Sequence, residues 1–288
     1  MHRKLPAVAL VLAAALASGC GAAARSADPA ASASNRSGAG MGAVLPAGLP
    51  SSPASPTASP GPRPPALPLA GRVVGIDPGH NGGNFTDSGF INQLIWNGRE
   101  SETCDTTGTE TASGFTEANF NFDVATDLRA DLIAAGATVV MTRQNNTGVG
   151  PCVTTRAQIL NRAHAAVAID IHADGGPTWG RGFTVLEPVA DGPNNSVISS
   201  SLQFGADVRA ALLRNTSMPE SNYDGTDGLI TRNDLAGLNL TTVPKVLIEC
   251  GNMPNSTDAA LLASSAFQQQ LARAFTAAIM VFLTGRSG

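Results

Sequence analysis

Three short apolar runs, each leading to a residue that can bind a metal or move a proton, constrain the fold of this chain most. The runs and the residues they lead to are 73–76 with His80, 167–171 with His172, and 246–248 with Glu249. Apolar runs of this length, bounded by turn residues, are typical of buried strands. Because ligands bind at the carboxyl ends of parallel strands, we expect the three side chains to converge at one edge of a sheet.

Helical patterns between these runs predict the fold class. Apolar residues recur at helical spacing from 120 to 132, after Thr116 as a candidate N-cap and Glu117 as the first helical residue, and Gly136 ends the pattern. Further helices are expected over 153–165, 197–213 and 266–283, and further strands over 138–141, 182–186 and 245–250. This alternation predicts a single α/β domain with a twisted, mostly parallel sheet flanked by helices.

Some segments are harder to interpret. We expect Arg156 and Arg162 to point mostly outward from the helix over 153–165. Residues 81–116 and 218–242 are polar and are interpreted as long loops, the first being long enough to be functional. The helix over 266–283 is apolar, but its glutamines and Arg273 favour packing in the core over a membrane anchor.

The first 20 residues resemble an export signal. A short basic start precedes the apolar run 5–17, which is shorter than the roughly 20 residues that a spanning helix needs. The run leads into Leu-Ala-Ser-Gly-Cys20, which is similar to a bacterial lipobox. We therefore expect lipidation of Cys20, with ordinary signal cleavage and release as the alternative. Either outcome places the protein outside the cytoplasm, in the cell envelope.

Residues 21–70 have the composition of a disordered tether. They contain 10 of the 19 prolines and no aromatic residue, so they cannot bury enough apolar surface to offset the entropy of ordering. A single folded domain is expected over 71–288. The net charge of −4 argues against nucleic acid or an anionic membrane surface as a partner.

Three cysteines follow the signal, and an exported protein can oxidise them. Cys104 and Cys152 both lie in polar loop sequence, so we expect them to form a disulfide. Such a bond would stabilise the fold by about 4 kcal/mol on the chain-entropy model. Cys250 follows Glu249 in an apolar strand and is expected on the opposite face, as a buried and inert thiol.

The histidines indicate a metal. Of four histidines, one lies in the signal, and His80 and His172 occupy equivalent strand ends. A catalytic zinc takes three protein ligands and leaves one position open for water. Glu117, at the start of a helix, is our candidate third ligand. Spacing alone leaves four other acidic residues open: Asp77, Glu100, Glu102 and Glu110.

Four ordered motifs resemble a known family. They read V-V-G-I-D-P-G-H, T-E-A-N-F-N, I-D-I-H-A-D and V-L-I-E-C-G-N-M-P-N. In this order they resemble the zinc-dependent N-acetylmuramoyl-L-alanine amidases that cleave bacterial peptidoglycan, and the resemblance spans residues 72–285. It implies one Zn²⁺ held by His80, Glu117 and His172, with Glu249 as the catalytic carboxylate. Arg143 and Arg156 also match positions usual in such enzymes.

The resemblance implies hydrolysis of the amide between the lactyl group of N-acetylmuramic acid and L-alanine, in peptidoglycan or muramyl peptide fragments. Three departures from the family pattern concern substrate preference: Asp170 for a common Ser, Asp174 for a common Asn, and Asn252-Met253 for a common Phe-Leu. Asp170 shares a strand face with His172, so it is a candidate to orient this ligand by accepting a hydrogen bond from its ring, with a capped loop contact as the alternative.

Four loop residues are candidates for substrate binding, with ordinary turn chemistry as the alternative: Arg232, Asn233, Leu238 and Asn239. We expect a monomer without a transmembrane helix in the mature chain.

Three other functions compete with the amidase interpretation. An iron oxygenase would need a second histidine downstream of His172, and this sequence has none there. A zinc carboxypeptidase acting on stem peptides would be distinguished from the amidase by its product, a released amino acid in place of a free muramyl lactyl group. A non-catalytic wall-binding lipoprotein would not require Glu249.

Overall fold

The site is carried by a six-stranded sheet. The computed structural model describes residues 66–285. The strands of this sheet are β1 (Val73–Pro78), β4 (Thr138–Met141), β5 (Val167–Asp174), β6 (Thr184–Pro188), β7 (Leu229–Arg232) and β8 (Lys245–Asn252). Their order is β4-β1-β5-β8-β6-β7. The first four are parallel to their neighbours and β6 runs antiparallel to β8, so the predicted mostly parallel sheet is confirmed.

Strand register brings the predicted site residues to the same edge. β1, β5 and β8 are adjacent, and Pro78 at the end of β1 lies opposite Ile171. On the next strand His172 lies directly opposite Glu249. Residues that are remote in sequence therefore meet at the carboxyl ends of three central strands, where ligands of open α/β sheets bind.

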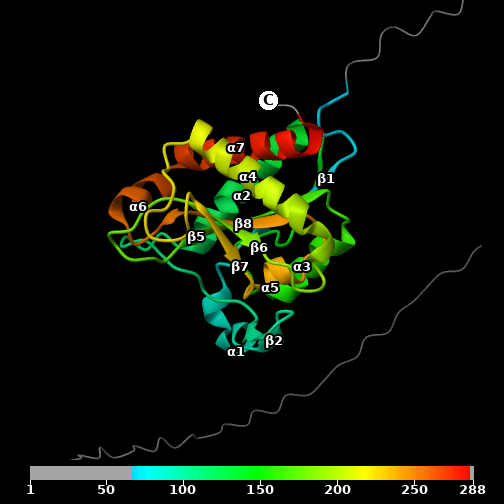
Figure 1. Ribbon diagram of the computed structural model, residues 1–288. Helices are drawn as coiled ribbons and strands as arrows, with labels where there is room; N and C mark the ends of the chain where they lie inside the picture. The colour runs from blue at the N-terminus through cyan, green and yellow to red at the C-terminus, as the bar shows by residue number, and fades with distance from the viewer. Residues whose placement is uncertain (1–65, 286–288) are drawn as a thin grey trace, which may run out of the picture. The chain divides into compact units, whose positions relative to one another are not determined.

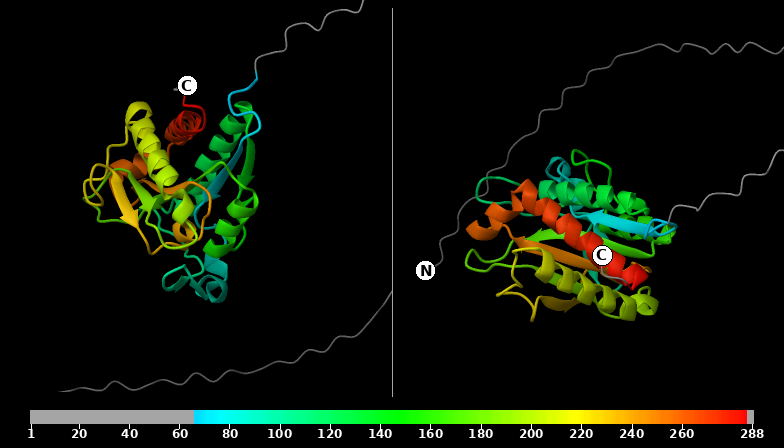
Figure 2. Two further views of the ribbon diagram at one scale, coloured as in Figure 1. Left: turned by 45° about the vertical axis from the view of Figure 1, so that its right-hand side comes forward. Right: turned by 90° about the horizontal axis from the view of Figure 1, so that it is seen from above.

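Three long helices cover one face of the sheet: α2 (Glu117–Ala134), α4 (Ile198–Asn215) and α7 (Ser265–Thr284). Figures 1 and 2 show α7 lying between α2 and α4 above the strands. The main core lies between these helices and the sheet, and Phe120, Phe204 and Phe275 are among its largest fully buried side chains. The short helix α6 (Ser256–Leu262), which the sequence did not predict, joins β8 to α7.

The opposite face is covered by α3 (Val153–Arg162) and α5 (Ala236–Asn239), with the loop after β1 beyond them (Figure 1). That loop is not irregular throughout. It holds a 3₁₀ turn η1 (Asn84–Thr86), the helix α1 (Ser88–Ile91) and a hairpin of β2 (Leu94–Trp96) and β3 (Ser101–Thr103). A second 3₁₀ turn, η2 (Asn195–Val197), precedes α4.

Several sequence expectations need correction. The segment 218–242, interpreted as a long loop, contains β7 and α5, and β4 is a half-exposed edge strand. On α4, Leu202 and Leu213 are exposed. Leu69 is fully buried and its N–H donates to the Ala135 carbonyl, so the folded domain begins before residue 71. The predicted signal, Cys20 and most of the tether lie outside the described residues.

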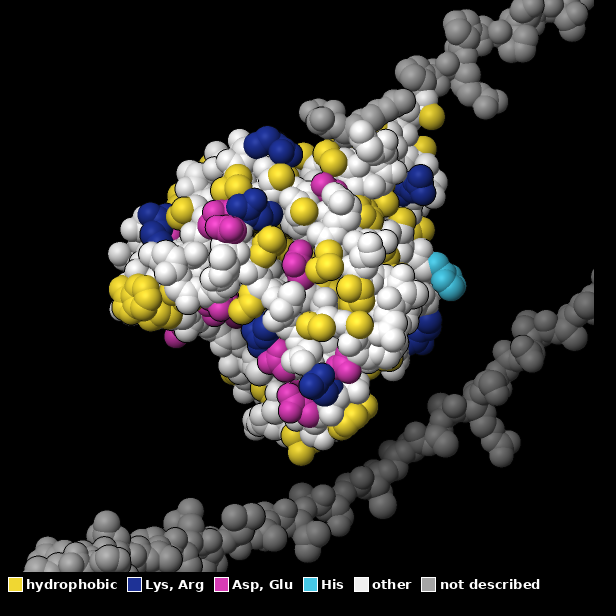
Figure 3. All heavy atoms as spheres, in the orientation of Figure 1, with side chains coloured by type: hydrophobic (Ala, Val, Ile, Leu, Met, Phe, Trp, Pro, Cys, Tyr) yellow, Lys and Arg dark blue, Asp and Glu magenta, His cyan; other side chains and the backbone are white. Residues whose placement is uncertain are grey.

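α7 packs against α2 and α4 as a core helix. Among residues 66–285, no helix combines the length and apolar character that crossing a membrane requires. On the face shown in Figure 3, basic and acidic side chains are interspersed and form no continuous patch of one sign.

Candidate metal centre

His80 is presented by a strained turn at the end of β1. Its φ is +54°, a left-handed conformation that is uncommon for a residue with a Cβ and that persists where the surroundings enforce it. Two buried arginines enforce it here. Arg143 Nε donates to the Pro78 carbonyl at 2.9 Å, and Arg156 Nη2 donates to the His80 carbonyl at 2.8 Å. Arg156 is therefore buried, and its expected outward orientation is wrong.

The turn also packs tightly against the second histidine. A Cβ on Gly79 would lie 2.2 Å from Cε1 of His172, closer than any real contact allows. Only glycine fits between the turn and the His172 ring, so Gly79 sets how closely the two histidines approach. The two imidazole rings stand edge to face, with centroids 4.9 Å apart.

Glu117 lies between the two histidines. Its Oε2 is 3.2 Å from His80 Nε2, and its Oε1 is 2.8 Å from His172 Nδ1. Thr116 caps the helix as predicted, because its side chain accepts a hydrogen bond from the Asn119 N–H. The first turn of α2 is thereby fixed with Glu117 facing the strand ends.

The three side chains suit a metal ion. One donor atom from each of His80, Glu117 and His172 can be chosen so that all lie within 4.8 Å of one another. Each histidine nitrogen approaches a different oxygen of Glu117, at 3.2 and 2.8 Å, so the carboxylate lies between the two rings. Two imidazoles and one carboxylate form a donor set that fits Zn²⁺.

A second carboxylate lies on the outer side of each histidine. Asp105 Oδ1 is 3.1 Å from His80 Nδ1, and Asp170 Oδ1 is 3.3 Å from His172 Nε2. Each acid faces the ring nitrogen that does not face Glu117. The sequence indicated Asp170 by its spacing from His172, but it gave no signal for Asp105, which lies in the loop after β3.

These two acids belong to a chain of buried ions. Arg156 contacts Asp105 at 3.2 Å and Asp77 at 3.1 Å, and Lys245 contacts Asp77 at 2.6 Å and Asp170 at 2.9 Å. Burial opposes the ionisation of Asp77, but Lys245 and Arg156 outweigh it and hold the pKa of that carboxyl well below its usual range. The chain runs from one histidine to the other beneath the strand ends.

Glu249 is a carboxylate without a counter-ion of its own. It lies opposite His172 in the sheet, and its Oε2 is buried and makes no hydrogen bond within residues 66–285. Burial raises its pKa to about 8, partly opposed by His172 and reinforced by Glu117. A buried, unpaired carboxyl with a raised pKa beside a ligand cluster is typical of a catalytic acid or base.

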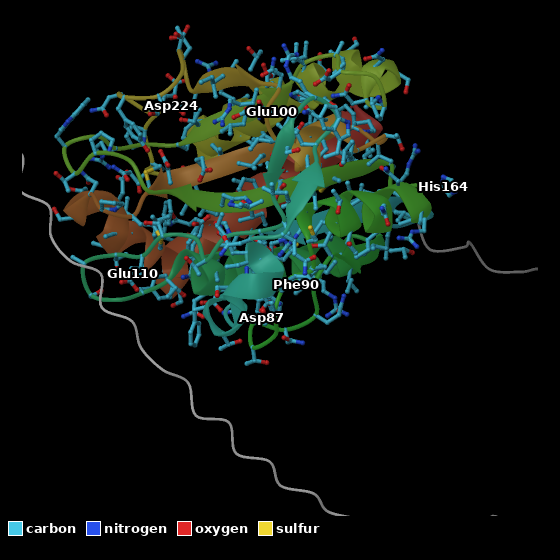
Figure 4. The ribbon with its side chains drawn as sticks, turned by 90° about the horizontal axis from the view of Figure 1, so that it is seen from below. Asp87, Phe90, Glu100, Glu110, His164 and Asp224 are labelled. Atoms are coloured by element: carbon cyan, nitrogen blue, oxygen red, sulfur yellow. The ribbon has the colours of Figure 1, made fainter. Side chains whose placement is uncertain are left out.

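The other acids considered as third ligand lie elsewhere. Glu100 and Glu110 are exposed on the outside of their loops, as Figure 4 shows. Glu102 accepts hydrogen bonds from Asn97 and from the Ala236 N–H, and Asp77 is engaged by Lys245 and Arg156. Glu117 is therefore the acid that the fold brings to both histidines. His164 lies at the outer end of α3, away from them (Figure 4).

Of the predicted substrate-binding residues, only Leu238 adjoins the histidines. It lines a cavity of about 210 Å³ that also touches His80, His172 and Asp170. Asn239 is fully buried and donates to the Asn233 carbonyl, and Arg232 pairs with Asp234 through two hydrogen bonds. These contacts hold the loop itself together, and a role of the four residues in substrate binding stays a prediction.

An aromatic pair that the sequence did not indicate lies beside Asp174. The hydroxyl of Tyr223 donates to Asp174 Oδ2 at 2.6 Å, and the Tyr223 ring packs edge to face on Trp179. Trp179 is 68% exposed, although the loop that carries it is tied down by hydrogen bonds from Asn252 and Asn255. Asp174 thus anchors an aromatic side chain two residues after His172.

The cysteines are thiols in this structure. Cys104 and Cys152 are free, so the expected disulfide is not formed, although the two side chains interact. Burial raises the pKa of the Cys104 thiol to about 12, and a hydrogen bond with Cys152 adds to this effect. Cys250 is fully buried in the apolar core, on the face of β8 opposite Glu249, as predicted.

A family comparison matches this geometry. Residues 74–281 match the model of the family described as N-acetylmuramoyl-L-alanine amidase. The chain belongs to this family. The matched residues include both histidines, Glu117 and Glu249, so the resemblance drawn from four sequence motifs is confirmed over almost the whole folded domain.

Individual relatives agree with the family assignment. N-acetylmuramoyl-L-alanine amidase Rv3717 of Mycobacterium tuberculosis is 39% identical over 221 residues, which cover 75% of this chain and 88% of that protein. The crystal structure of the amidase Ami1 of Mycobacterium smegmatis is 40% identical, with a TM-score of 0.71 over 76% of this chain and 99% of that one. An amidase of Nostoc punctiforme, AmiC2, is 22% identical with a TM-score of 0.56 and shows the shared fold.

Proposed function

We propose that this amidase is zinc-dependent and hydrolyses the amide between the lactyl group of N-acetylmuramic acid and the L-alanine of peptidoglycan stem peptides. The observation that carries the proposal is the arrangement of His80, Glu117 and His172 around one point, with the unpaired carboxyl of Glu249 on the adjacent strand. Three ligands and a nearby base are the parts that a zinc hydrolase requires.

The protein side chains divide the work. His80, Glu117 and His172 hold the metal. A bound Zn²⁺ supplies the positive charge that acidifies a water molecule and polarises the scissile carbonyl. Glu249 accepts the proton of the attacking water and returns it to the departing amine of L-alanine. The carbon–nitrogen bond breaks, and the products are a free lactyl carboxylate and a stem peptide with a free amino terminus.

The environment of Glu249 suits this role. A carboxyl whose pKa is about 8 in the metal-free protein holds a proton strongly, because burial disfavours its charged form. A cation beside His172 favours ionisation, so metal binding prepares Glu249 to act as a base. The raised affinity for a proton also lets the same group act as an acid towards the leaving amine.

The test uses purified peptidoglycan. The full-length protein, after metal removal, is incubated with wall before and after addition of one equivalent of Zn²⁺, and soluble products are identified by mass spectrometry. Release of stem peptides beginning with L-alanine, dependent on zinc, supports the proposal. Release of single amino acids from the peptide end indicates a carboxypeptidase, and binding to wall without release indicates a non-catalytic wall protein.

The proposal extends to the segments around the domain. Residues 1–20 direct export, the segment predicted over 21–70 tethers the domain, and Cys20 carries a lipid, which places the enzyme in the cell envelope. It acts as a monomer. The mass of the mature amino terminus tests lipidation. Alkylation of the exported protein before and after reduction tests the Cys104–Cys152 bond, because a bonded pair takes up label only after reduction.

A further inference from the structure

The two histidines are oriented in opposite senses by the acids on their outer sides. His80 directs Nε2 to Glu117 and Nδ1 to Asp105, whereas His172 directs Nδ1 to Glu117 and Nε2 to Asp170. A neutral imidazole carries one proton, and a ligating nitrogen cannot hold it. The proton of each ring therefore belongs on the nitrogen that faces an aspartate.

Asp170 has one carboxylate oxygen that can accept a hydrogen bond from the protonated nitrogen of His172. Its Oδ2 contacts Lys245 Nζ at 2.9 Å. Its Oδ1 is buried and makes no hydrogen bond to any described residue, and the polar atom facing it is Nε2 of His172 at 3.3 Å. A buried carboxylate oxygen is costly without a partner, so the contact with the imidazole is the one that accounts for its placement.

Lys245 alone does not explain why Asp170 is buried as a charged carboxylate. The ammonium already contacts Asp77 at 2.6 Å, and both Lys245 and Asp77 are about 1% exposed. Asp77, Asp105 and Asp170 share the two cations Arg156 and Lys245, so this chain of contacts holds one more negative charge than positive. That additional charge lies on the outer side of a ligand to a cation, where it increases the basicity of the ring.

The surroundings keep this pair in place. The backbone N–H of Lys245 donates to Ser201 Oγ, and α5 closes over the pair so that a Cβ on Gly237 would lie 3.4 Å from both Asp170 Oδ2 and Lys245 Nζ. The rotamer of Asp170 is set by Lys245 on one side and by the imidazole on the other.

We propose that Asp170 and Lys245 form a positioning pair that fixes the tautomer and orientation of His172, so that this ligand offers Nδ1 to the metal while His80 offers Nε2. The inference rests on the proposed zinc site and adds to it a role for two further residues. Where the related motif commonly has Ser before Ile-His, this chain has Asp170, and the partner cation comes from the neighbouring strand β8.

The first test measures zinc affinity by competition with a chelator, using the full-length protein. Asp170→Asn keeps the size of the side chain and removes its charge, and we expect the dissociation constant to rise 10- to 100-fold. Asp258→Asn is the matched control. Asp258 is also fully buried and bonded to an arginine, Arg181, but it contacts no residue of the metal centre. Its zinc affinity should stay within twofold of the parent.

The second test separates positioning from folding. Asp170→Ser combined with Lys245→Met removes both ions together, which leaves Asp77 paired with Arg156 and no charge of the pair uncompensated. If the pair serves only to stabilise the fold, this double variant recovers the parental affinity. If the pair positions His172, the weakened affinity persists although the variant unfolds at a normal temperature.

The third test reads the tautomers directly. Nitrogen NMR of the zinc-loaded, ¹⁵N-histidine-labelled parent should show the proton on Nδ1 for His80 and on Nε2 for His172, and Asp170→Asn should disturb only the second. A parent that binds no zinc refutes the proposed function itself. A parent that binds zinc, with unchanged affinity in Asp170→Asn or with His172 protonated on Nδ1, refutes the positioning pair alone.

Discussion

The two faces of β5 are built for different purposes. One face carries Ile169, Ile171 and Ala173, all buried in the core formed with α2 and α7. The other face carries Asp170, His172 and Asp174, which join a chain of ions and a candidate metal centre. Because side chains alternate along a strand, eight consecutive residues serve both purposes at once.

The difference teaches where the stability of the molecule comes from. Apolar burial stabilises by about 25 cal/mol per Å², whereas buried ions seldom repay the cost of losing water. The charged face is therefore held by the apolar face. It is organised for ligand geometry and not for stability, and substitutions on the two faces should separate activity from folding.

The largest expected effect is on catalysis. Glu249→Gln removes the proposed base and should lower kcat for release of stem peptides by about 10²- to 10⁴-fold. Folding and zinc content should be retained, because Glu249 forms no ion pair within residues 66–285 that the substitution would leave unmatched. The matched control is Glu187→Gln, a carboxyl that is buried against α4 on the opposite face and whose pKa burial also raises. Equal loss in both variants would show that burial, and not position, matters.

The next effect is on stability. Phe275 is fully buried between α7 and the sheet, and Phe275→Ala should lower the free energy of unfolding by about 3–5 kcal/mol through lost contacts and a residual cavity. Urea denaturation measures the loss. At temperatures where the variant remains folded, kcat should equal that of the parent. A fall in kcat comparable to that of Glu249→Gln would mean that the two faces are not separable.

A smaller effect is expected from pH. In the metal-free protein burial opposes protonation of His80, but Glu117 outweighs it and raises the pKa of His80 to about 9. Protonated His80 cannot bind a metal, so zinc and the proton compete for Nε2. Apparent zinc affinity should rise by about tenfold per pH unit, for each proton displaced, from pH 7 towards pH 9. Chelator competition at fixed pH values measures it, and a flat profile would contradict the ligand assignment.

The smallest effect tests the connection between the faces. Thr116 caps α2, the helix whose apolar side packs in the core and whose first residue is Glu117. Thr116→Ala should lower the free energy of unfolding by about 1 kcal/mol. Because the cap also fixes the first turn, zinc affinity should weaken slightly in the same variant. Weakened stability with unchanged zinc affinity would show that Glu117 is held by its other contacts alone.

The sequence predicted the ends of β1, β5 and β8 well, because the apolar run of a strand and the turn that ends it are both local features. A short apolar run ending at a turn identifies β1, β5 and β8, and His80, His172 and Glu249 follow from those runs. Glu117 needed the family resemblance, since spacing did not separate it from Glu100 or Glu110. What distinguishes it is the direction in which α2 leaves its cap, which only the fold determines.

Residues that act over long range were missed or misplaced. Asp105 lies in a polar loop where acids are common, and nothing local marks its contact with His80. Arg156 shares a helix face with the buried Leu160, four residues on, but its charge suggested solvent. Its actual partners, Asp77 and Asp105, come from other elements, and pairing across elements leaves no periodic trace in a sequence.

The early burial of Leu69 sets the direction from which the chain enters the domain. Leu69 is bonded to Ala135 beside the first residue of β1, while His80 follows the last residue of that strand. Six strand residues at about 3.3 Å each place entry and metal centre roughly 20 Å apart, at opposite ends of the strand. The described chain therefore enters the domain at the end of β1 that is remote from the candidate metal centre.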